Sequence, residues 1–307
     1  MPNRSYEFVQ VDVFTQTPLA GNPLAVFTDA RGLNDQEMQA LAREMNLSET
    51  TFIFPREGAT EIRDGKKVRI FTVEQELPFA GHPTLGTALY LYASGSNPKK
   101  PAEISLDLKA GKIPVRFTAN SQNAGRDRVD GQVFGEMRQR DPEFGTPLSR
   151  EDAARVIGIA VDEISLEWPI QPISTGLTFT IVPFRNRQTL SDLKFSYAQA
   201  AEFLKNTGAN FFYFLCPERR EGGLEARARM FFYGGEDPAT GSAAGCAASW
   251  MVKHGVANSN EQVLIHQGAE CRRPSEMYVR ATREGERVTD VRVGGYAMEI
   301  LRGTVAL

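Results

Sequence analysis

Two stretches decide the fold of this 307-residue chain: PFAGHPTLGTALYLY at residues 78–92 and YGGEDPATGSAAGCAASW at residues 233–250. They align with Pro83 on Pro238, which sets a separation of 155 residues, about half the length of the chain. Earlier in each half, Gly21 of PLAGNPLAVF has its match in ISTGLTFTIV at the same separation. Two distant matches in one register indicate an internal duplication, and a period of this length predicts two domains built on one plan.

The two halves also share an order of expected elements. NDQEMQALAREM at 34–45 has the apolar spacing of an amphipathic helix, with Asn34 and Glu37 as a capping box, and the strand TTFIF follows it. In the second half, SYAQAAEFLKN at 196–206 predicts a matching helix capped by Ser196, followed by the strand FFYFL. The remaining residues are rich in strand patterns, so the sequence predicts a mixed α+β fold.

The quoted stretches also contain candidate site residues. Proline suits the first turn of a helix, so we expect helices to begin near Pro83 and Pro238, with His82 and Asp237 at or next to their N-caps. Asp is an ordinary helix cap, but imidazole caps poorly, so the pair favours a role in holding a polar substrate or sharing proton transfer. Free N–H groups at such helix starts bind anions, and the hydroxyl of Ser242 would join them.

Glu49 is the candidate acid or base. NLSETTFIF places it between the first helix and its strand, whereas the matching junction of the second half carries Asn210. A carboxylate at the start of a strand is most often only solvated. The duplication nevertheless keeps an ionisable group on one side alone, and a group that both removes and returns a proton requires only one carboxylate.

Composition excludes several classes of protein. The chain has 35 basic and 38 acidic residues, a net charge of −3 and no blocks of like charge, which argues against nucleic-acid or polybasic membrane partners. We find neither a signal core nor an apolar stretch of about 18 residues, and we expect a cytoplasmic protein. Three widely spaced cysteines indicate reduced thiols, and the three histidines lack the spacing of a metal site. The signatures GxGxxG, GxxxxGK[ST] and GxSxG are absent.

Four ordered motifs carry a resemblance to a known family. QVDVFTQTPLAGNPLAVF, NLSETTFIF, LPFAGHPTLGTA and GGEDPATGSAAG together resemble the PhzF-like proteins of the phenazine biosynthesis group, which share the diaminopimelate epimerase fold. The resemblance runs nearly end to end. It implies an α+β protein of two pseudo-symmetric domains, each a β-barrel-like sheet wrapped around a central helix. It also implies an active site between the two halves and a homodimer.

The expected domain limits combine this resemblance with composition. ANSQNAGRDRVDG at 119–131 has few large apolar residues and is the best linker. We therefore expect domains at 1–125 and 126–289. The resemblance further implies that the carboxy-terminal strand, 290–307, packs back on the first domain.

The resemblance also implies a reaction. The phenazine enzyme isomerises trans-2,3-dihydro-3-hydroxyanthranilate by moving a proton with a glutamate, which maps onto Glu49. The other residues that the resemblance marks are, for catalysis, His82 and Asp237 and, for substrate binding, Ser48, Gly81 and Ser242. In the related epimerases two cysteines transfer protons from opposite faces, but those positions fall on or beside His82 and Asp237 here, which argues against a two-thiol mechanism. No metal or organic cofactor is implied, although composition leaves open a lysine that binds pyridoxal phosphate.

Three functional hypotheses remain at this point. The leading one is a cofactor-independent isomerase that moves a proton on a small carboxylate-bearing substrate. The second is an amino-acid racemase or epimerase that uses His82 and Asp237 as a two-sided acid and base. The third is a non-catalytic metabolite-binding protein of the same fold. All three have a small-molecule carboxylate as partner, and none calls for nucleic acid or a membrane.

Overall fold

The computed structural model describes residues 4–95, 100–119, 129–130 and 132–307. It divides the chain into two compact units, Met1–Arg138 with Gly294–Leu307, and Gln139–Val293. The boundary predicted between 125 and 126, and most of the linker predicted at 119–131, lie outside the described residues.

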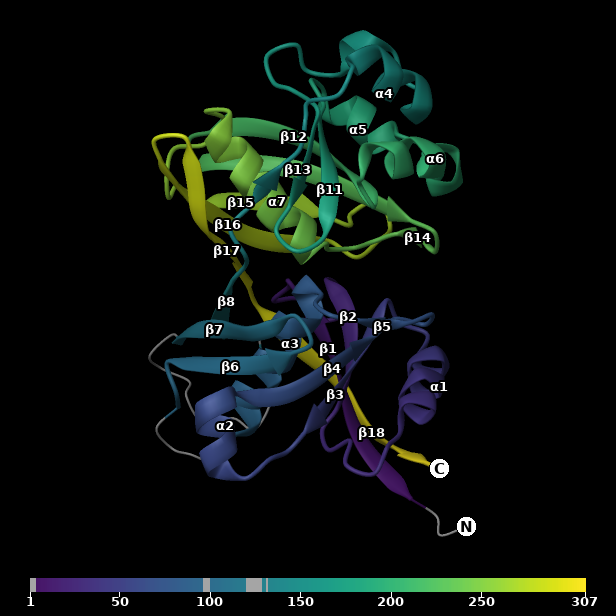
Figure 1. Ribbon diagram of the computed structural model, residues 1–307, viewed down its shortest axis with the longest axis vertical. Coiled ribbons are helices and arrows are strands. Elements are labelled where there is room, and N and C mark those ends of the chain that lie inside the picture. Colours follow the sequence, from purple (N-terminus) through teal and green to yellow (C-terminus); the bar gives the residue numbers. More distant parts are fainter. Residues whose placement is uncertain (1–3, 96–99, 120–128, 131) are drawn as a thin grey trace. The chain divides into compact units, whose positions relative to one another are not determined.

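The first unit is a mixed sheet with three helices among its described residues (Figure 1). Its strands are β1 (Ser5–Val13), β2 (Asn22–Phe27), β3 (Glu49–Phe54), β4 (Lys66–Phe71), β5 (Glu76–Leu77), β6 (Glu103–Leu108), β7 (Gly111–Ala119), β8 (Val133–Arg138) and β18 (Ala297–Ala306). Its helices are α1 (Asp35–Met45), α2 (Gly58–Asp64) and α3 (Gly81–Ser94). The carboxy-terminal strand β18 pairs antiparallel with β1, which pairs on its other side with β2.

The second unit repeats this plan. Its strands are β9 (Glu143–Phe144), β10 (Gln171–Ser174), β11 (Thr178–Pro183), β12 (Phe211–Arg220), β13 (Gly223–Phe232), β14 (Gly235–Glu236), β15 (Val263–Gln267), β16 (Ser275–Glu284) and β17 (Arg287–Gly295), whose last residues belong to the first unit. Its helices are α4 (Arg150–Ile157), the 3₁₀ helix η1 (Val161–Glu163), α5 (Arg187–Asp192), α6 (Tyr197–Thr207) and α7 (Gly241–Lys253).

The pairing order of the strands is the same in both units. An antiparallel pair comes first, β1–β2 or β10–β11, and the second strand then pairs parallel with β3 or β12. The next strand, β4 or β13, pairs antiparallel with β3 or β12, and it also pairs with a two-residue strand, β5 or β14. The buried helix, α3 or α7, follows. After the helix, β6 pairs parallel with β4, and β15 pairs parallel with β13. The predicted pseudo-symmetric α+β fold, with a sheet around a central helix in each half, is confirmed.

The central helices are buried because their side chains are small where the sheet approaches. Helix α3 packs against β1, β2, β3, β6 and β8, and every residue of its first two turns is buried. A Cβ on Gly86 would lie 2.6 Å from Cγ2 of Val13 on β1, so only glycine allows this separation. In α7, every residue from Gly241 to Val252 is buried, and a Cβ on Gly245 would lie 2.0 Å from Oε1 of Gln139.

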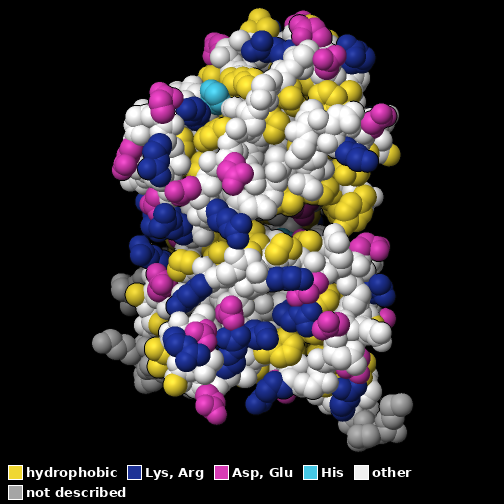
Figure 2. Space-filling view, viewed as in Figure 1, with side chains coloured by type: hydrophobic (Ala, Val, Ile, Leu, Met, Phe, Trp, Pro, Cys, Tyr) yellow, Lys and Arg dark blue, Asp and Glu magenta, His cyan; other side chains and the backbone are white. Residues whose placement is uncertain are grey.

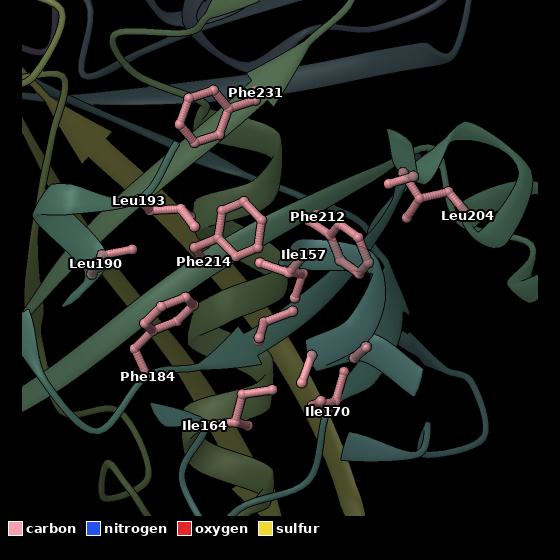
Figure 3. Close-up of a cluster of buried hydrophobic side chains, with 14 of the residues drawn as sticks. Ile157, Ile164, Ile170, Phe184, Leu190, Leu193, Leu204, Phe212, Phe214 and Phe231 are labelled. Atoms are coloured by element: carbon pink, nitrogen blue, oxygen red, sulfur yellow. The ribbon is translucent and has the colours of Figure 1, made fainter. Parts of the chain in front are cut away.

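Aromatic and aliphatic side chains together fill the space between the sheet of the second unit and its outer helices (Figure 3). Phe214 of β12 lies at the middle of this cluster, with its ring centroid 5.2 Å from that of Phe195 and 5.8 Å from that of Phe184. Phe212 and Phe231 also contact it. Burial of this apolar area, at about 25 cal/mol per Å², is the main source of stability for the unit.

Both predicted amphipathic helices are present, but only the first has the predicted cap. Helix α1 begins after Asn34, whose side-chain oxygen accepts the N–H of Glu37 at 3.0 Å, while Glu37 accepts the N–H of Asn34 at 3.0 Å. The capping box is therefore confirmed. Helix α6 does begin after Ser196, but the side chain of Ser196 makes no capping hydrogen bond.

Replacement of Asn34 by alanine is expected to lower the free energy of unfolding by about 1 kcal/mol, because one donor at the start of α1 loses its acceptor. Urea unfolding at neutral pH measures this. Gln36→Ala, an exposed change on the same helix, is the control. Equal effects of the two substitutions would show that the capping box contributes nothing.

The surface carries charges of both signs. Figure 2 shows lysine and arginine side chains interspersed with aspartate and glutamate on the face in view. Many of them form short ion pairs, such as Arg69 with Glu76 and Arg219 with Glu261. Within the described part of the chain, no helix is long and apolar enough to cross a membrane.

Candidate active site

The first unit brings two of the predicted site residues together. Glu49 is the first residue of β3 and His82 is the second residue of α3. Oε2 of Glu49 lies 3.5 Å from Nε2 of His82, and the side chains are only 16% and 5% exposed. A carboxyl group and an imidazole in contact, and largely shielded from water, are a suitable pair for proton transfer.

A buried hydroxyl pair holds the two elements that carry these residues. Oγ1 of Thr51 on β3 lies 2.9 Å from Oγ1 of Thr87 on α3, and both residues are inaccessible to solvent. Thr51 follows Glu49 by two positions, so it lies on the same face of the strand. Ser48, half-buried, directly precedes β3, and Gly81, buried, begins α3. Ser48 and Gly81 are therefore next to Glu49 and His82 along the chain.

Burial determines the charge of His82. It lowers the pKa of the imidazole from 6.5 to about 3, so the ring is neutral near pH 7. Nε2 makes no hydrogen bond to any described residue, and its nearest acidic group is Glu49. A neutral imidazole beside a carboxyl group can accept a hydrogen bond from it when the carboxyl group holds a proton.

The lowered pKa of His82 predicts a dependence of stability on pH. Between pH 6.5 and about 3, the unfolded chain binds a proton on this histidine and the folded chain does not. The free energy of unfolding therefore contains a contribution that is complete above pH 6.5 and is lost as the pH falls, by up to about 1.4 kcal/mol per pH unit. Urea unfolding at pH 4.5, 5.5 and 6.5 gives the free energy of unfolding at each pH. This free energy should fall less steeply with decreasing pH in His82→Gln than in the wild type. His266→Gln is the control, and an unchanged slope in His82→Gln would contradict the neutral buried state.

In the second unit, Asp237 lies in the turn between β14 and α7. Its N–H donates to the carbonyl oxygen of Met230 at 2.9 Å, and its Oδ2 accepts the hydroxyl of Thr240 at 2.6 Å. Thr240 is the N-cap residue of α7, and its side chain bonds Asp237 in place of the helix. Ser242, buried, is the second residue of α7. The carboxyl group of Asp237 is thus held by the N-cap residue of α7.

The predicted helix starts need a correction. Pro83 is the third residue of α3, inside the first turn as expected, but Pro238 lies three positions before α7. Neither His82 nor Asp237 is an N-cap residue, since those positions are taken by Ala80 and Thr240. By position in the helix, His82 corresponds to Ser242, so His82 and Asp237 are not structural equivalents.

The counterpart of Glu49 also changes. Leu24 of β2 and Phe179 of β11 match, because each is the first residue of its strand in the parallel pairing. Their partners are Glu49 of β3 and Phe211 of β12. Asn210 therefore matches the residue before Glu49, not Glu49 itself. The ionisable group at this junction is still present in one unit only.

The structure offers no support for a thiol nucleophile at Cys246. Its Sγ lies 3.6 Å from Oγ1 of Thr175, and burial raises the pKa of the thiol to about 11. A thiol of this kind remains protonated and unreactive, as expected for a packing residue. In residues 4–95, 100–119, 129–130 and 132–307, no group of three or more histidine, cysteine and acidic side chains is arranged to hold a metal ion.

Two polar residues that the sequence analysis did not single out contact Asp237 or its turn. Thr240 donates to the carboxylate, and Gln267, at the end of β15, donates to the backbone oxygen of Asp237 at 2.7 Å. A threonine just before a helix is a recognisable N-cap pattern, so Thr240 could have been found. Gln267 lies thirty positions from Asp237 and carries no sequence signal.

Comparison with known proteins identifies the family. The family model described as "Phenazine biosynthesis-like protein" matches residues 11–303. The trans-2,3-dihydro-3-hydroxyanthranilate isomerase of Pseudomonas fluorescens is 35% identical over 98% of this chain and 100% of its own length. The enzyme of the same name from Pseudomonas aeruginosa is 34% identical over the same shares.

Solved structures agree with this assignment. A protein described as a predicted epimerase from Pseudomonas aeruginosa is 31% identical, covers 98% of this chain and 99% of its own, and has a TM-score of 0.81. A PhzF-family phenazine biosynthesis protein from Bacillus anthracis is 26% identical, with coverage of 99% and 100% and a TM-score of 0.83. A probable proline racemase, at 13% identity and a TM-score of 0.65, shares the fold alone. The chain therefore belongs to the phenazine biosynthesis-like family, and it is an isomerase of that family.

Proposed function

We propose that this isomerase works without a cofactor and uses Glu49 to move a proton between two carbons of a small carboxylate-bearing substrate. The observation that carries the proposal is the contact of 3.5 Å between Glu49 and a buried imidazole. The names of the full-length relatives suggest trans-2,3-dihydro-3-hydroxyanthranilate, or a cyclic compound similar to it, as the substrate.

The proton transfer needs no external oxidant or base. The Glu49 carboxylate takes a proton from one carbon, and the electron pair of the broken C–H bond moves into the adjacent conjugated system of the substrate. The same carboxyl group then delivers the proton to a second carbon, so atoms and electrons balance within the substrate. Neutral His82 accepts a hydrogen bond from the protonated carboxyl group and keeps it oriented between the two steps.

The proposal assigns the remaining site residues to the same reaction. Asp237 would repel a substrate carboxylate, so it contacts an amino or hydroxyl group of the substrate. The hydroxyl groups of Ser48 and Ser242, and the backbone N–H of Gly81, are donors suited to a carboxylate. Among these residues Glu49 alone carries the proton, and the others hold the substrate.

Deuterium uptake from solvent tests the proposed function. In D₂O, the wild-type protein should convert trans-2,3-dihydro-3-hydroxyanthranilate to a product with at most one carbon-bound deuterium per molecule, and it should not label a panel of amino acids. Labelling of an amino acid at its α-carbon would point to racemase chemistry instead. Binding of the substrate without any conversion would point to a metabolite-binding protein.

The proposal also includes a cytoplasmic homodimer. The three free thiols, Cys216, Cys246 and Cys271, support the cytoplasm, because a reducing compartment keeps thiols free. The family resemblance supports the homodimer. Light scattering coupled to size-exclusion chromatography should give twice the mass of one chain, which is 34.0 kDa. A mass equal to one chain would refute the dimer.

A further inference from the structure

Asp237 belongs to a hydrogen-bonded network of four buried polar side chains. The other three are Tyr213 on β12, Thr240 before α7 and Gln267 at the end of β15, and none of the four is more than 7% exposed. Backbone groups fix the orientation of the Gln267 amide. Its Nε2 faces the carbonyl oxygen of Asp237 at 2.7 Å, and its Oε1 faces the N–H of Thr240 at 3.4 Å. Because a carbonyl oxygen only accepts and an N–H only donates, the amide has one possible orientation.

This orientation fixes every other proton in the network. Oε1 of Gln267 accepts the hydroxyl of Tyr213 at 3.0 Å, and Nε2 donates to the hydroxyl oxygen of Thr240 at 2.9 Å. Since that oxygen receives a hydrogen bond from Gln267, the hydroxyl proton of Thr240 points to Oδ2 of Asp237, 2.6 Å away. Donation thus runs in one direction, from Tyr213 through Gln267 and Thr240 to Asp237.

The surrounding structure keeps the network rigid. Gly268, the residue after Gln267, has a φ of +82°, and a Cβ there would lie 2.4 Å from the carbonyl oxygen of Pro238. The end of β15 therefore lies against the turn that carries Asp237. Burial raises the pKa of Tyr213 well above its ordinary value, so its hydroxyl stays a donor over the working range of pH. Because Oε1 of Gln267 can only accept, the hydroxyl of Tyr213 must donate to it, and the reversed arrangement is excluded.

We propose that Gln267, oriented by backbone groups of Asp237 and Thr240 and bonded by Tyr213, is a positioning residue for Asp237 and acts through the hydroxyl of Thr240. The network keeps Oδ2 of Asp237 an acceptor, so the carboxyl group presents a fixed direction to the amino or hydroxyl group of the substrate. This inference rests on the role of Asp237 in the proposed function. It adds three residues to the machinery, none of which is required to touch the substrate.

Matched substitutions test the proposal in the full-length protein. Thr240→Val removes the hydroxyl at nearly constant shape, and we expect it to raise KM for trans-2,3-dihydro-3-hydroxyanthranilate about 10-fold with a smaller change in kcat. Thr240→Ser keeps the hydroxyl and should restore KM to within about 3-fold of the wild type. Gln267→Leu should behave like Thr240→Val. Gln171→Leu is the control, because Gln171 is also a buried amide of the second unit but bonds only Gly145 and His254 in the described structure.

The outcomes separate a positioning role from a structural one. Suppose that Thr240→Val, Gln267→Leu and the control Gln171→Leu lose thermal stability alike, but that the active fraction of each keeps the wild-type KM. The network then only stabilises the fold, and the proposal fails. It also fails if Thr240→Ser is as impaired as Thr240→Val.

A second measurement needs no substrate. In ¹⁵N-labelled protein, both side-chain amide protons of Gln267, assigned by their loss in Gln267→Leu, should exchange slowly with solvent. Exchange should accelerate in Thr240→Val and stay slow in Gln171→Leu. Fast exchange in the wild type would overturn the proposed network. If the wild type does not convert trans-2,3-dihydro-3-hydroxyanthranilate, the proposed function fails, whereas this amide-exchange experiment still decides the network.

Discussion

Glu49→Gln is expected to lower kcat by about 10²- to 10⁴-fold while KM stays within about 3-fold of the wild-type value. Glutamine keeps the shape of the side chain and its polar contact with His82, but it has no proton to transfer at neutral pH. The loss should appear equally in turnover and in exchange of substrate hydrogen with D₂O. Thermal melting confirms that the variant is folded.

The control for this prediction is Glu44→Gln, the same chemical change at an exposed position of α1, which should leave kcat unchanged. His82→Asn and Asp237→Asn should weaken turnover through positioning without abolishing exchange. A two-base racemase predicts the opposite order. An active Glu49→Gln variant together with an inactive Asp237→Asn variant would overturn the assignment of roles.

Phe214→Ala should give the largest loss of stability, about 3–5 kcal/mol, because it leaves a cavity at the middle of the aromatic cluster in the second unit. The ring contacts four other phenylalanines, so neighbouring side chains cannot refill the space without losing their own contacts. Urea unfolding followed by tryptophan fluorescence measures the effect. Leu166→Ala, at a side chain that is 67% exposed, is the control and should change stability by less than about 0.5 kcal/mol. A loss below about 1.5 kcal/mol for Phe214→Ala would show that the cluster is loosely packed.

Local patterns predicted the elements well because each element depends mainly on its own residues. The apolar spacing of α1 and its capping pair, Asn34 and Glu37, are both contained in twelve consecutive residues. The same holds for β3 and β12, whose apolar runs begin where the preceding helix ends. The duplication was also visible, because glycine and proline mark fixed backbone positions that both halves need.

The register of the duplication was less accessible. The matched glycines Gly21 and Gly176 are 155 residues apart, but β3 and β12 begin 162 apart and α3 and α7 begin 160 apart. The connection that contains α5 and α6 is longer than the one that contains α1, and such surface connections vary in length without altering the sheet. A constant separation of 155 residues therefore aligns His82 with Asp237. The starts of α3 and α7 instead align His82 with Ser242. The bounds of the helices and the pairing of the strands, which the sequence does not contain, give the structural correspondence.

The site was partly predictable for the same reason. Glu49 and His82 lie in distinctive motifs, which predict both residues as site residues but do not predict their contact. Gln267 lies in QVLIHQG, an ordinary strand pattern, and its importance comes only from the turn that β15 meets in space. Buried polar partners of this kind are set by tertiary structure.

The path of the hydrogen tests the account most directly. Wild-type protein in ordinary water would be given trans-2,3-dihydro-3-hydroxyanthranilate that carries deuterium on the carbon that loses hydrogen, for a single turnover, and the product would be analysed by NMR. If Glu49 alone carries the proton, some of the deuterium should appear on the carbon that gains hydrogen, because a carboxyl group that is only 16% exposed exchanges slowly with water between the two steps. Product whose new C–H bond contains only hydrogen from water, with every deuterium released to the solvent, would contradict the single-base mechanism.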